Sequence, residues 1–339
     1  MNPDWQAFLR SRGADTSEGA ARFAPGELGD CNLFDLSHLG LIRVTGTDAE
    51  SFLQGQFTND TKALTDDHSQ MSAYCSPKGR MLASFRLFRH DGDIHLQLPF
   101  DRLATVMQRL GMFRLRSEVT IEDAGDSLVQ FAVAGDCAAA LLGELAPPRA
   151  DEVRHSDGIT CVALGGDRPR FLCVGPVEAA TALWETLAED ATPANSDAWT
   201  LLEIRAGAPA VYEQTVEAFV PQMANLQLVN GVSFTKGCYT GQEVVARMQY
   251  LGKLKRRMYH VRFDGECFAP GTELFAPGSA SGQGSGRLVV SAPAPEGGCE
   301  ALAVVEIASA DQGEVHLGDP AGPMLEFLEL PYSFEEPKG

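Results

Sequence analysis

The order of hydrophobic periodicities along the chain is the sequence feature that most constrains its fold. Up to about residue 206, apolar residues alternate between strand-like spacing and helical spacing. After about residue 257 the helical spacing disappears, and short alternating runs separated by glycine and proline replace it. We therefore predict an α+β amino-terminal part followed by a small antiparallel β-barrel or sandwich.

The amino-terminal part contains two successive α+β patterns. Thr47-Asp48 is a suitable N-cap for a short helix, and a second helix is expected to begin at Asp101 and to end at Gly111. Three further helices are expected over 136–145, 177–189 and 196–206. The predicted strands of this part are 41–45, 69–76, 80–89, 94–99, 113–122, 129–134, 159–164 and 170–174. The predicted strands of the carboxy-terminal part are 258–263, 271–275, 286–291, 301–306 and 323–328.

Length and charge limit the classes of protein that this chain can belong to. Its 339 residues exceed what one hydrophobic core usually supports, so we expect two or three domains. A formal net charge of −19 repels phosphate backbones and argues against non-specific nucleic-acid binding. The amino terminus lacks the pattern of a secretory signal, and no apolar run reaches transmembrane length. We therefore expect a cytoplasmic protein without a membrane partner.

The eight cysteines lie far apart, and none forms a C-x-x-C pair. In a chain of this length without a signal sequence, we expect reduced thiols and no disulfide framework. Seven of the cysteines lie in apolar or ordinary contexts and are expected to be small core residues: Cys31, Cys75, Cys137, Cys161, Cys173, Cys267 and Cys299. Cys238 is the exception.

Cys238 lies within the run Lys236-Gly237-Cys238-Tyr239-Thr240-Gly241-Gln242-Glu243. The two glycines allow positive φ and a close approach of the backbone to a ligand. Because Lys236 on the same turn can stabilise a reactive thiolate, we predict Cys238 and Lys236 as catalytic residues. The alternative is a cysteine that fills a tight turn. One cysteine cannot complete a tetrahedral metal site, so any metal or cluster at Cys238 would be transient or shared.

The residues after Cys238 offer polar groups for a ligand. Gln242 and Glu243 can orient one, although Glu243 equally suits the first turn of a following helix, where its charge meets the positive helix end. Arg247 lies four residues after Glu243, which fits an ion pair across one helical turn. A basic stretch in this acidic chain indicates a solvated linker or, as second choice, a contact for an anionic ligand or partner. The stretch comprises Lys253, Lys255, Arg256 and Arg257.

The run at 236–243 resembles the motif of the YgfZ family, the folate-binding relatives of the glycine-cleavage T-protein (aminomethyltransferase). The residues before the run, Phe219-Val220-Pro221-Gln222 and Gly231-Val232-Ser233-Phe234, are also similar to that family. Further upstream, residues 52–60 (Phe-Leu-Gln-Gly-Gln-Phe-Thr-Asn-Asp) resemble the part that the family shares with the T-protein. The similarity spans roughly residues 30–290.

The resemblance implies three domains arranged like a cloverleaf around a central channel that admits tetrahydrofolate. It also implies that the first two domains are interleaved in sequence. The expected divisions are an amino-terminal extension (1–29), a first α+β domain (30–126), a second α+β domain that carries the motif (127–256) and a carboxy-terminal β-barrel (257–339).

The same resemblance implies a function. Members of the family are associated with assembly or repair of iron–sulfur proteins, including enzymes that modify tRNA. We therefore predict a tetrahydrofolate-binding accessory protein in which Cys238 is a redox thiol or a ligand of a shared iron–sulfur cluster. Its expected partners are iron–sulfur carrier or client proteins, without direct nucleic-acid binding. The motif residues expected to contact folate are Tyr239, Gln242, Glu243 and Arg247.

Two departures from the T-protein argue against aminomethyl transfer. Where the T-protein carries an acidic pair, this chain has Gly79-Arg80-Met81-Leu82-Ala83-Ser84-Phe85, which contains no acid. The T-protein's Arg-x-Glu-Ala-Gly pattern is replaced by Glu203-Ile204-Arg205-Ala206-Gly207. A folate-dependent one-carbon transferase or demethylase remains the alternative, and it would need a substitute general acid or base. A tRNA-binding module is the weakest hypothesis because of the negative charge.

Overall fold

The computed structural model describes the chain except residues 18, 25–28, 278–283 and 335–339. It divides into two compact units that alternate along the sequence. Unit 1 comprises Met1–Phe52, Thr61–Gln70 and Arg86–Trp199, and unit 2 comprises Leu53–Asp60, Met71–Phe85 and Thr200–Gly339. Helices and strands are mixed in the first two hundred residues and strands dominate the last part, so the predicted α+β class is confirmed.

Unit 1 contains a six-stranded sheet with the strand order β11-β1-β7-β10-β9-β8. Only the β1–β11 pair is parallel among the pairings described for this sheet. Its strands are β1 (Cys31–Asp35), β7 (Val129–Gly135), β8 (Val153–Ser156), β9 (Ile159–Leu164), β10 (Arg170–Gly175) and β11 (Thr192–Ala194). Three helices and a 3₁₀ turn accompany the sheet: α1 (Pro3–Ser11), α4 (Ala138–Leu142), η2 (Gly143–Leu145) and α5 (Val177–Leu187).

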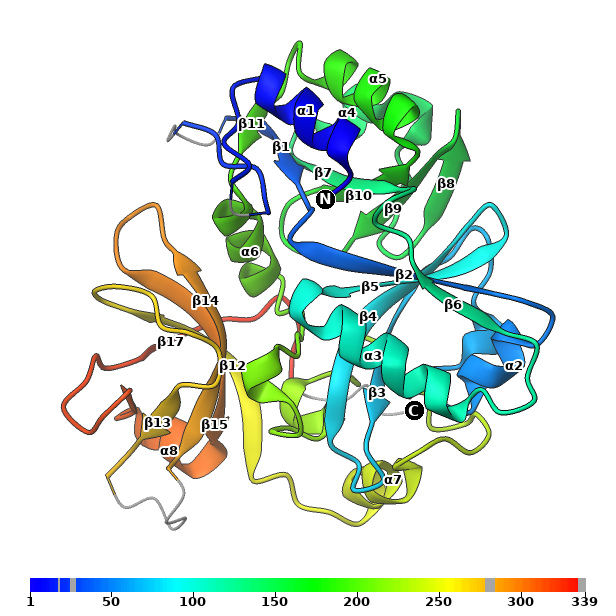
Figure 1. The fold of residues 1–339 in the computed structure, drawn as a ribbon. Helices are drawn as coiled ribbons and strands as arrows, with labels where there is room; N and C mark the ends of the chain where they lie inside the picture. The colour runs from blue at the N-terminus through cyan, green and yellow to red at the C-terminus, as the bar shows by residue number, and fades with distance from the viewer. Residues whose placement is uncertain (18, 25–28, 278–283, 335–339) are drawn as a thin grey trace. The chain divides into compact units, whose positions relative to one another are not determined.

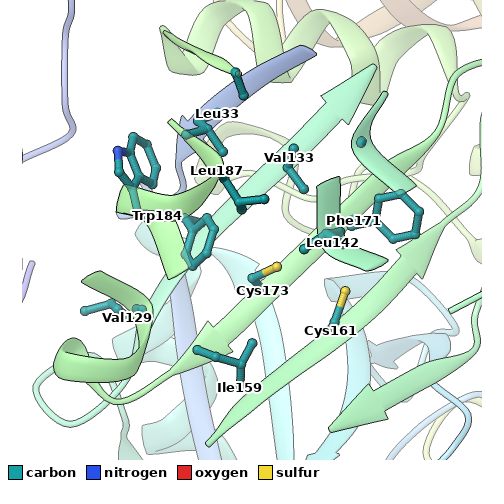
Figure 2. Packing of buried hydrophobic residues seen from close by; sticks show 14 of the residues in the cluster. Leu33, Val129, Val133, Leu142, Ile159, Cys161, Phe171, Cys173, Trp184 and Leu187 are labelled. Carbon is teal, nitrogen blue, oxygen red and sulfur yellow. The ribbon is translucent and has the colours of Figure 1, made fainter. Parts of the chain in front are cut away.

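Apolar side chains from these helices and one face of the sheet form the core of unit 1. Trp184 of α5 stands edge-on to Trp5 of α1 and to Phe131 of β7, with ring centroids 5.5 Å apart in each pair. Cys161 and Cys173 are cross-strand neighbours beneath this cluster, and both are free thiols (Figure 2). Their burial confirms the prediction that they are small core residues.

The rest of unit 1 is built around β2 (Leu39–Thr45), which pairs on its two sides with β5 (Asp93–Pro99) and β6 (Thr120–Asp123). Strand β4 (Met81–His90) pairs with β5 through residues 86–90, which belong to unit 1, whereas the first half of β4 and most of β3 (Gln70–Cys75) belong to unit 2. The three strands predicted at 69–76, 80–89 and 94–99 are therefore confirmed. The helical elements of this region are α2 (Ala49–Gln54), η1 (Thr61–Ala63) and α3 (Phe100–Phe113).

Helix α3 continues past Gly111, so the prediction that this glycine ends the helix was wrong. The apolar stripe of α3 includes Leu103, Val106 and Leu110, all of which are buried. This packing holds the last turn in place, and a glycine costs only about 1 kcal/mol inside a helix. The strand expected at 113–122 is correspondingly shorter and starts at Thr120.

Unit 2 ends in a six-stranded antiparallel sheet that curves into a half-barrel (Figure 1). The strand order is β16-β13-β14-β15-β12-β17, which confirms the antiparallel β-structure predicted after residue 257. Its elements are β12 (Arg256–Phe263), β13 (Glu273–Phe275), β14 (Gly286–Pro293), β15 (Cys299–Glu306), α8 (Ile307–Gln312), β16 (His316–Leu317) and β17 (Glu326–Leu328).

The remainder of unit 2 surrounds one apolar cluster that positions the cysteine motif. Side chains of this cluster come from β3, β4, β12, β14, β15 and the segments between residues 201 and 245. Those segments include α6 (Ser196–Arg205), η3 (Glu213–Thr215), η4 (Pro221–Ala224) and α7 (Gln242–Tyr250). Val245 of α7 is fully buried in the cluster and anchors the helix that follows the motif.

Four cysteines are paired in two disulfides, Cys31–Cys137 and Cys267–Cys299. Their Cα atoms lie 5.8 and 5.5 Å apart, within the range that a disulfide spans. The expectation of reduced thiols was therefore wrong for these four residues. The partners are 106 and 32 residues apart in sequence, so spacing alone did not indicate the pairing.

No helix in the described part of the chain combines the length and apolar character needed to cross a membrane.

Candidate functional site around Cys238

The loop that carries Cys238 has one buried residue on each side of an exposed pair. Lys236 and Tyr239 are buried, whereas Gly237 and Cys238 are exposed. The side chains on either side of the exposed pair thus point into unit 2 and hold the loop. As a result, the thiol of Cys238 faces solvent on an anchored backbone.

Lys236 is bound by the turn that follows α2. Its Nζ donates hydrogen bonds to the carbonyl oxygens of Gln54 at 2.8 Å, Phe57 at 2.6 Å and Asn59 at 2.7 Å. A lysine ammonium has three N–H donors, so these carbonyls use all of them. The ammonium also lies 5.1 Å from the ring centroid of Tyr239. Lys236 therefore fastens the motif to residues 54–59, and this geometry does not support its predicted role as activator of the Cys238 thiol.

Burial shifts the pKa values of the two anchoring side chains, Lys236 and Tyr239, in opposite directions. It lowers the pKa of Lys236 to about 8, against the smaller effect of the Asp60 carboxylate. It raises the pKa of Tyr239 well above the ordinary value for a phenol, with a smaller contribution from Cys75. Tyr239 is therefore a neutral, buried side chain at neutral pH. Cys75 itself is buried, and its pKa is raised to about 12, so it is an inert core thiol.

Gly241 lets the start of α7 contact the β3–β4 turn backbone to backbone. It is the N-cap of α7 with φ of 85°, and a Cβ at this position would lie 2.5 Å from the Ser76 carbonyl oxygen. Gly79 in the facing turn has φ of 69°, and a Cβ there would lie 2.7 Å from Cβ of Val244. Both positions therefore require glycine for conformation and for space.

Helix α7 presents Glu243 and Arg247 to solvent. Glu243 lies in the first turn, where its charge complements the positive helix end as the sequence predicted. Both side chains are within the described part of the chain, and they do not pair with each other, so the expected i,i+4 ion pair was wrong. Gln242 is half-buried at the start of the helix, and its backbone N–H donates to the Tyr239 carbonyl at 3.2 Å.

Three amide side chains between residues 222 and 227 carry buried oxygens without a hydrogen-bond donor: Gln222, Asn225 and Gln227. The amide nitrogen of Gln222 donates to the Val245 carbonyl at 2.8 Å, and that of Asn225 donates to the Met258 carbonyl at 2.9 Å. These bonds orient both amides and leave their oxygens as unused acceptors, which is costly inside a protein. The roles of these residues could not be found from spacing, because each lies in a 3₁₀ turn or irregular segment.

No group of three or more His, Cys, Asp or Glu side chains within the described ranges is arranged to hold a metal ion.

Comparisons with known proteins identify the family. Residues 29–159 match the family model described as the GCVT N-terminal domain. The tRNA-modifying protein YgfZ of Colwellia psychrerythraea is 36% identical over 237 residues, which covers 69% of this chain and 72% of that protein. The protein of the same name from Yersinia enterocolitica is 33% identical over 311 residues, covering 90% of this chain and 94% of that protein. This chain belongs to the YgfZ family.

The fold of this YgfZ protein is shared with a solved enzyme. The glycine cleavage system aminomethyltransferase T from Bartonella henselae superimposes with a TM-score of 0.67 at 18% sequence identity. The likeness covers 89% of this chain and 85% of the enzyme. The predicted resemblance to the T-protein fold is therefore confirmed.

Both sequence departures from the T-protein have structural roles in this YgfZ protein. Ser84 of β4 is buried, and its hydroxyl donates to the Pro209 carbonyl at 3.1 Å. Arg205 at the end of α6 contacts the carboxylate of Glu300 through two nitrogens, at 3.0 and 2.5 Å. His260 lies 2.8 Å from the same carboxylate. Arg205 thus joins α6 to the half-barrel.

Burial alone would raise the pKa of Glu300, but hydrogen bonds from His260 and Arg205 hold it at about 2. The group is therefore a permanent anion at neutral pH. Because its oxygens are already occupied by these two partners, we assign it to the packing of unit 2 and not to chemistry.

Proposed function

We propose that this YgfZ protein is a tetrahydrofolate-binding accessory factor for the assembly or repair of iron–sulfur proteins, with Cys238 as its reactive group. The observation that carries the proposal is the exposed thiol on a loop whose two anchors, Lys236 and Tyr239, are buried. An accessible thiol on a fixed backbone can meet a second protein in a defined orientation. An effect on tRNA modification follows indirectly when the client is an iron–sulfur enzyme that modifies tRNA.

The role of Cys238 follows from thiolate chemistry. A thiolate is a soft ligand that suits iron–sulfur clusters, and it is also the form that takes part in thiol redox chemistry. One cysteine supplies one ligand, so the other ligands would come from the carrier or client that brings the cluster. In this proposal the cluster is cargo that passes between proteins.

The buried amide oxygens between residues 222 and 227 support folate as the small-molecule ligand. A reduced pterin carries several N–H donors, and the unused acceptors on Gln222, Asn225 and Gln227 match that donor set. When bound, tetrahydrofolate would supply one-carbon or reducing chemistry. Of the motif residues proposed to contact it, Tyr239 is buried whereas Glu243 and Arg247 face solvent. We therefore expect the amides to contribute more to folate affinity than Glu243 or Arg247.

The first test is an anaerobic calorimetric titration with tetrahydrofolate. We expect wild type and Cys238→Ala to bind equally, and Gln222→Leu to bind about tenfold more weakly, because one directed hydrogen bond is lost. Glu243→Gln, which changes a solvent-facing residue of the motif, should weaken binding less than Gln222→Leu. Absence of binding to all four proteins would overturn the folate part of the proposal.

The second test addresses the thiol. In a strain that lacks the protein, Cys238→Ala should fail to restore the activity of iron–sulfur enzymes, whereas Cys75→Ala should restore it if the variant folds. Full rescue by Cys238→Ala would overturn the thiol role. Turnover of an aminomethyl or N-methyl donor by the folate-bound protein would instead favour the one-carbon transferase.

A further inference from the structure

One face of α7 and the residues that follow it expose apolar side chains. Val244, Tyr250 and Leu251 are 36%, 68% and 84% exposed. Val244 and Arg247 are three residues apart, so they share one side of the helix, and Tyr250 and the C-cap residue Leu251 lie at its carboxyl end. Val245, on another side of α7, is buried in the core of unit 2.

The aromatic member of this face is held in position. The ring of Tyr250 packs edge-on against Phe234, with centroids 6.0 Å apart and planes at 70°. Phe234 itself is partly buried and packs against the apolar cluster of unit 2. A supported aromatic side chain next to an exposed leucine is the composition of an interface centre, because little side-chain entropy is lost on binding.

The segment that contains this face is basic in an acidic protein. Residues 244–255 contain Arg247, Lys253 and Lys255 and no carboxylate, whereas the whole chain has a net charge of −19. The three cations are exposed. Lys78 adds a fourth exposed cation on the turn whose Gly79 contacts Val244. The local charge of this basic and apolar surface is therefore opposite to the net charge of the molecule. Such a surface complements a partner that is acidic around an apolar centre.

We propose that this surface, consisting of Val244, Arg247, Tyr250, Leu251, Lys253 and Lys255, docks an acidic protein partner next to the Cys238 thiol. Cys238 lies three residues before Gly241, the N-cap of α7, so a partner on this face meets the loop that exposes the thiol. The choice of partner rests on the proposed function, which makes it an iron–sulfur carrier with an acidic surface. The apolar centre favours a protein over RNA, since phosphates need cations but gain nothing from exposed Leu251 or Val244.

The test measures binding of a purified acidic iron–sulfur carrier protein from the same organism by biolayer interferometry at two salt concentrations. We expect Tyr250→Ser/Leu251→Ser and Lys253→Glu/Lys255→Glu each to weaken binding by about tenfold or more. The wild-type affinity should fall with salt, and the charge-reversed variant should lose most of that dependence. Leu115→Ser/Arg116→Glu is the matched control, because Leu115 is 89% exposed in unit 1 and is also followed by a basic residue.

Each other outcome overturns the proposal. Unchanged carrier affinity in both variants of this surface would show that it does not dock the carrier, and so would absence of carrier binding to wild type. Loss of tRNA binding in the same variants, measured by gel shift, would make the surface an RNA site. Loss of self-association in sedimentation would make it an interface between copies of this chain.

The result of this docking test can be distinguished from the result of the test of the proposed function. Cys238→Ala should bind the carrier like wild type, because docking does not use the thiol. If Cys238→Ala rescues the strain while the variants of the docking surface still bind the carrier weakly, the docking surface is supported and the thiol role is overturned. If the variants of the docking surface bind the carrier normally while Cys238→Ala fails to rescue the strain, the thiol role is supported and the docking surface is overturned.

Discussion

At the scale of single residues, Lys236 illustrates how a motif position can change its interpretation in three dimensions. Its place two residues before Cys238 indicated an electrostatic role at the thiol. Its ammonium instead binds three carbonyls of residues 54–59, which lie about 180 residues earlier in the chain. A charged side chain that satisfies three backbone acceptors stabilises the loop, and the exposed thiol depends on that support.

Replacing Lys236 with methionine should destabilise the protein. The variant keeps the aliphatic stem but loses three charge-assisted hydrogen bonds, and we expect a loss of about 2–4 kcal/mol in the free energy of unfolding. Urea denaturation measures this loss. The exposed control Lys253→Met should change the free energy by less than about 0.5 kcal/mol. A loss in Lys236→Met no larger than in the control would contradict the anchoring role.

At the scale of elements, α6 and the half-barrel are joined through one buried carboxylate. Arg205 of α6 and His260 of β12 both bind Glu300 of β15. The residues lie 95 and 40 positions from Glu300, so only the packing of the elements brings the three together. This contact explains why an arginine at the end of α6 is useful without folate chemistry.

The Glu300 contact should make stability depend on acid pH. Its pKa is about 2 in the folded protein and 4.5 for the unperturbed group, so the unfolded state binds more protons between these values. The resulting stabilisation, up to about 3 kcal/mol, is fully present above pH 4.5 and is lost as the pH falls toward 2. Urea titrations at pH 6 and pH 3 should show a smaller pH dependence for Glu300→Gln than for wild type. Equal slopes would contradict the contact.

At the scale of the whole molecule, the two compact units alternate along the sequence. Residues 53–60 and 71–85 belong to unit 2 although unit 1 surrounds them in the sequence. This arrangement supplies the carbonyls for Lys236 and the glycine turn for Gly241. The division into four segments at 29/30, 126/127 and 256/257, and the central folate channel, stay predictions.

Thiol labelling tests the cysteine pattern of the whole chain. Under native conditions without reductant, iodoacetamide should modify Cys238 first, because the other three free cysteines are buried. Unfolding without reductant should expose four thiols, and reduction should expose all eight. Mass spectrometry counts the adducts. Eight adducts in the unreduced, unfolded protein would contradict both disulfides.

The sequence by itself determined the types and order of most elements and the family. Local periodicity suffices for elements such as β4, β5 and α5, since a strand or helix shows its buried face in neighbouring residues. Local periodicity did not indicate α1, β1, β8 or β11. Helix α1 lies before the first predicted element, and the three strands are short. The motif at 236–243 also marked Cys238, because its glycines, lysine and thiol are adjacent in the chain.

The tertiary structure decided which groups meet. Lys236 and Gln54 are 182 residues apart, and Cys31 and Cys137 are 106 apart. Such contacts form because packing of distant segments buries apolar area, and periodicity does not record which segments will pack together. The sequence therefore marked Cys238 as the proposed reactive cysteine, whereas the fold decided that its lysine neighbour anchors the loop and that α7 exposes apolar side chains.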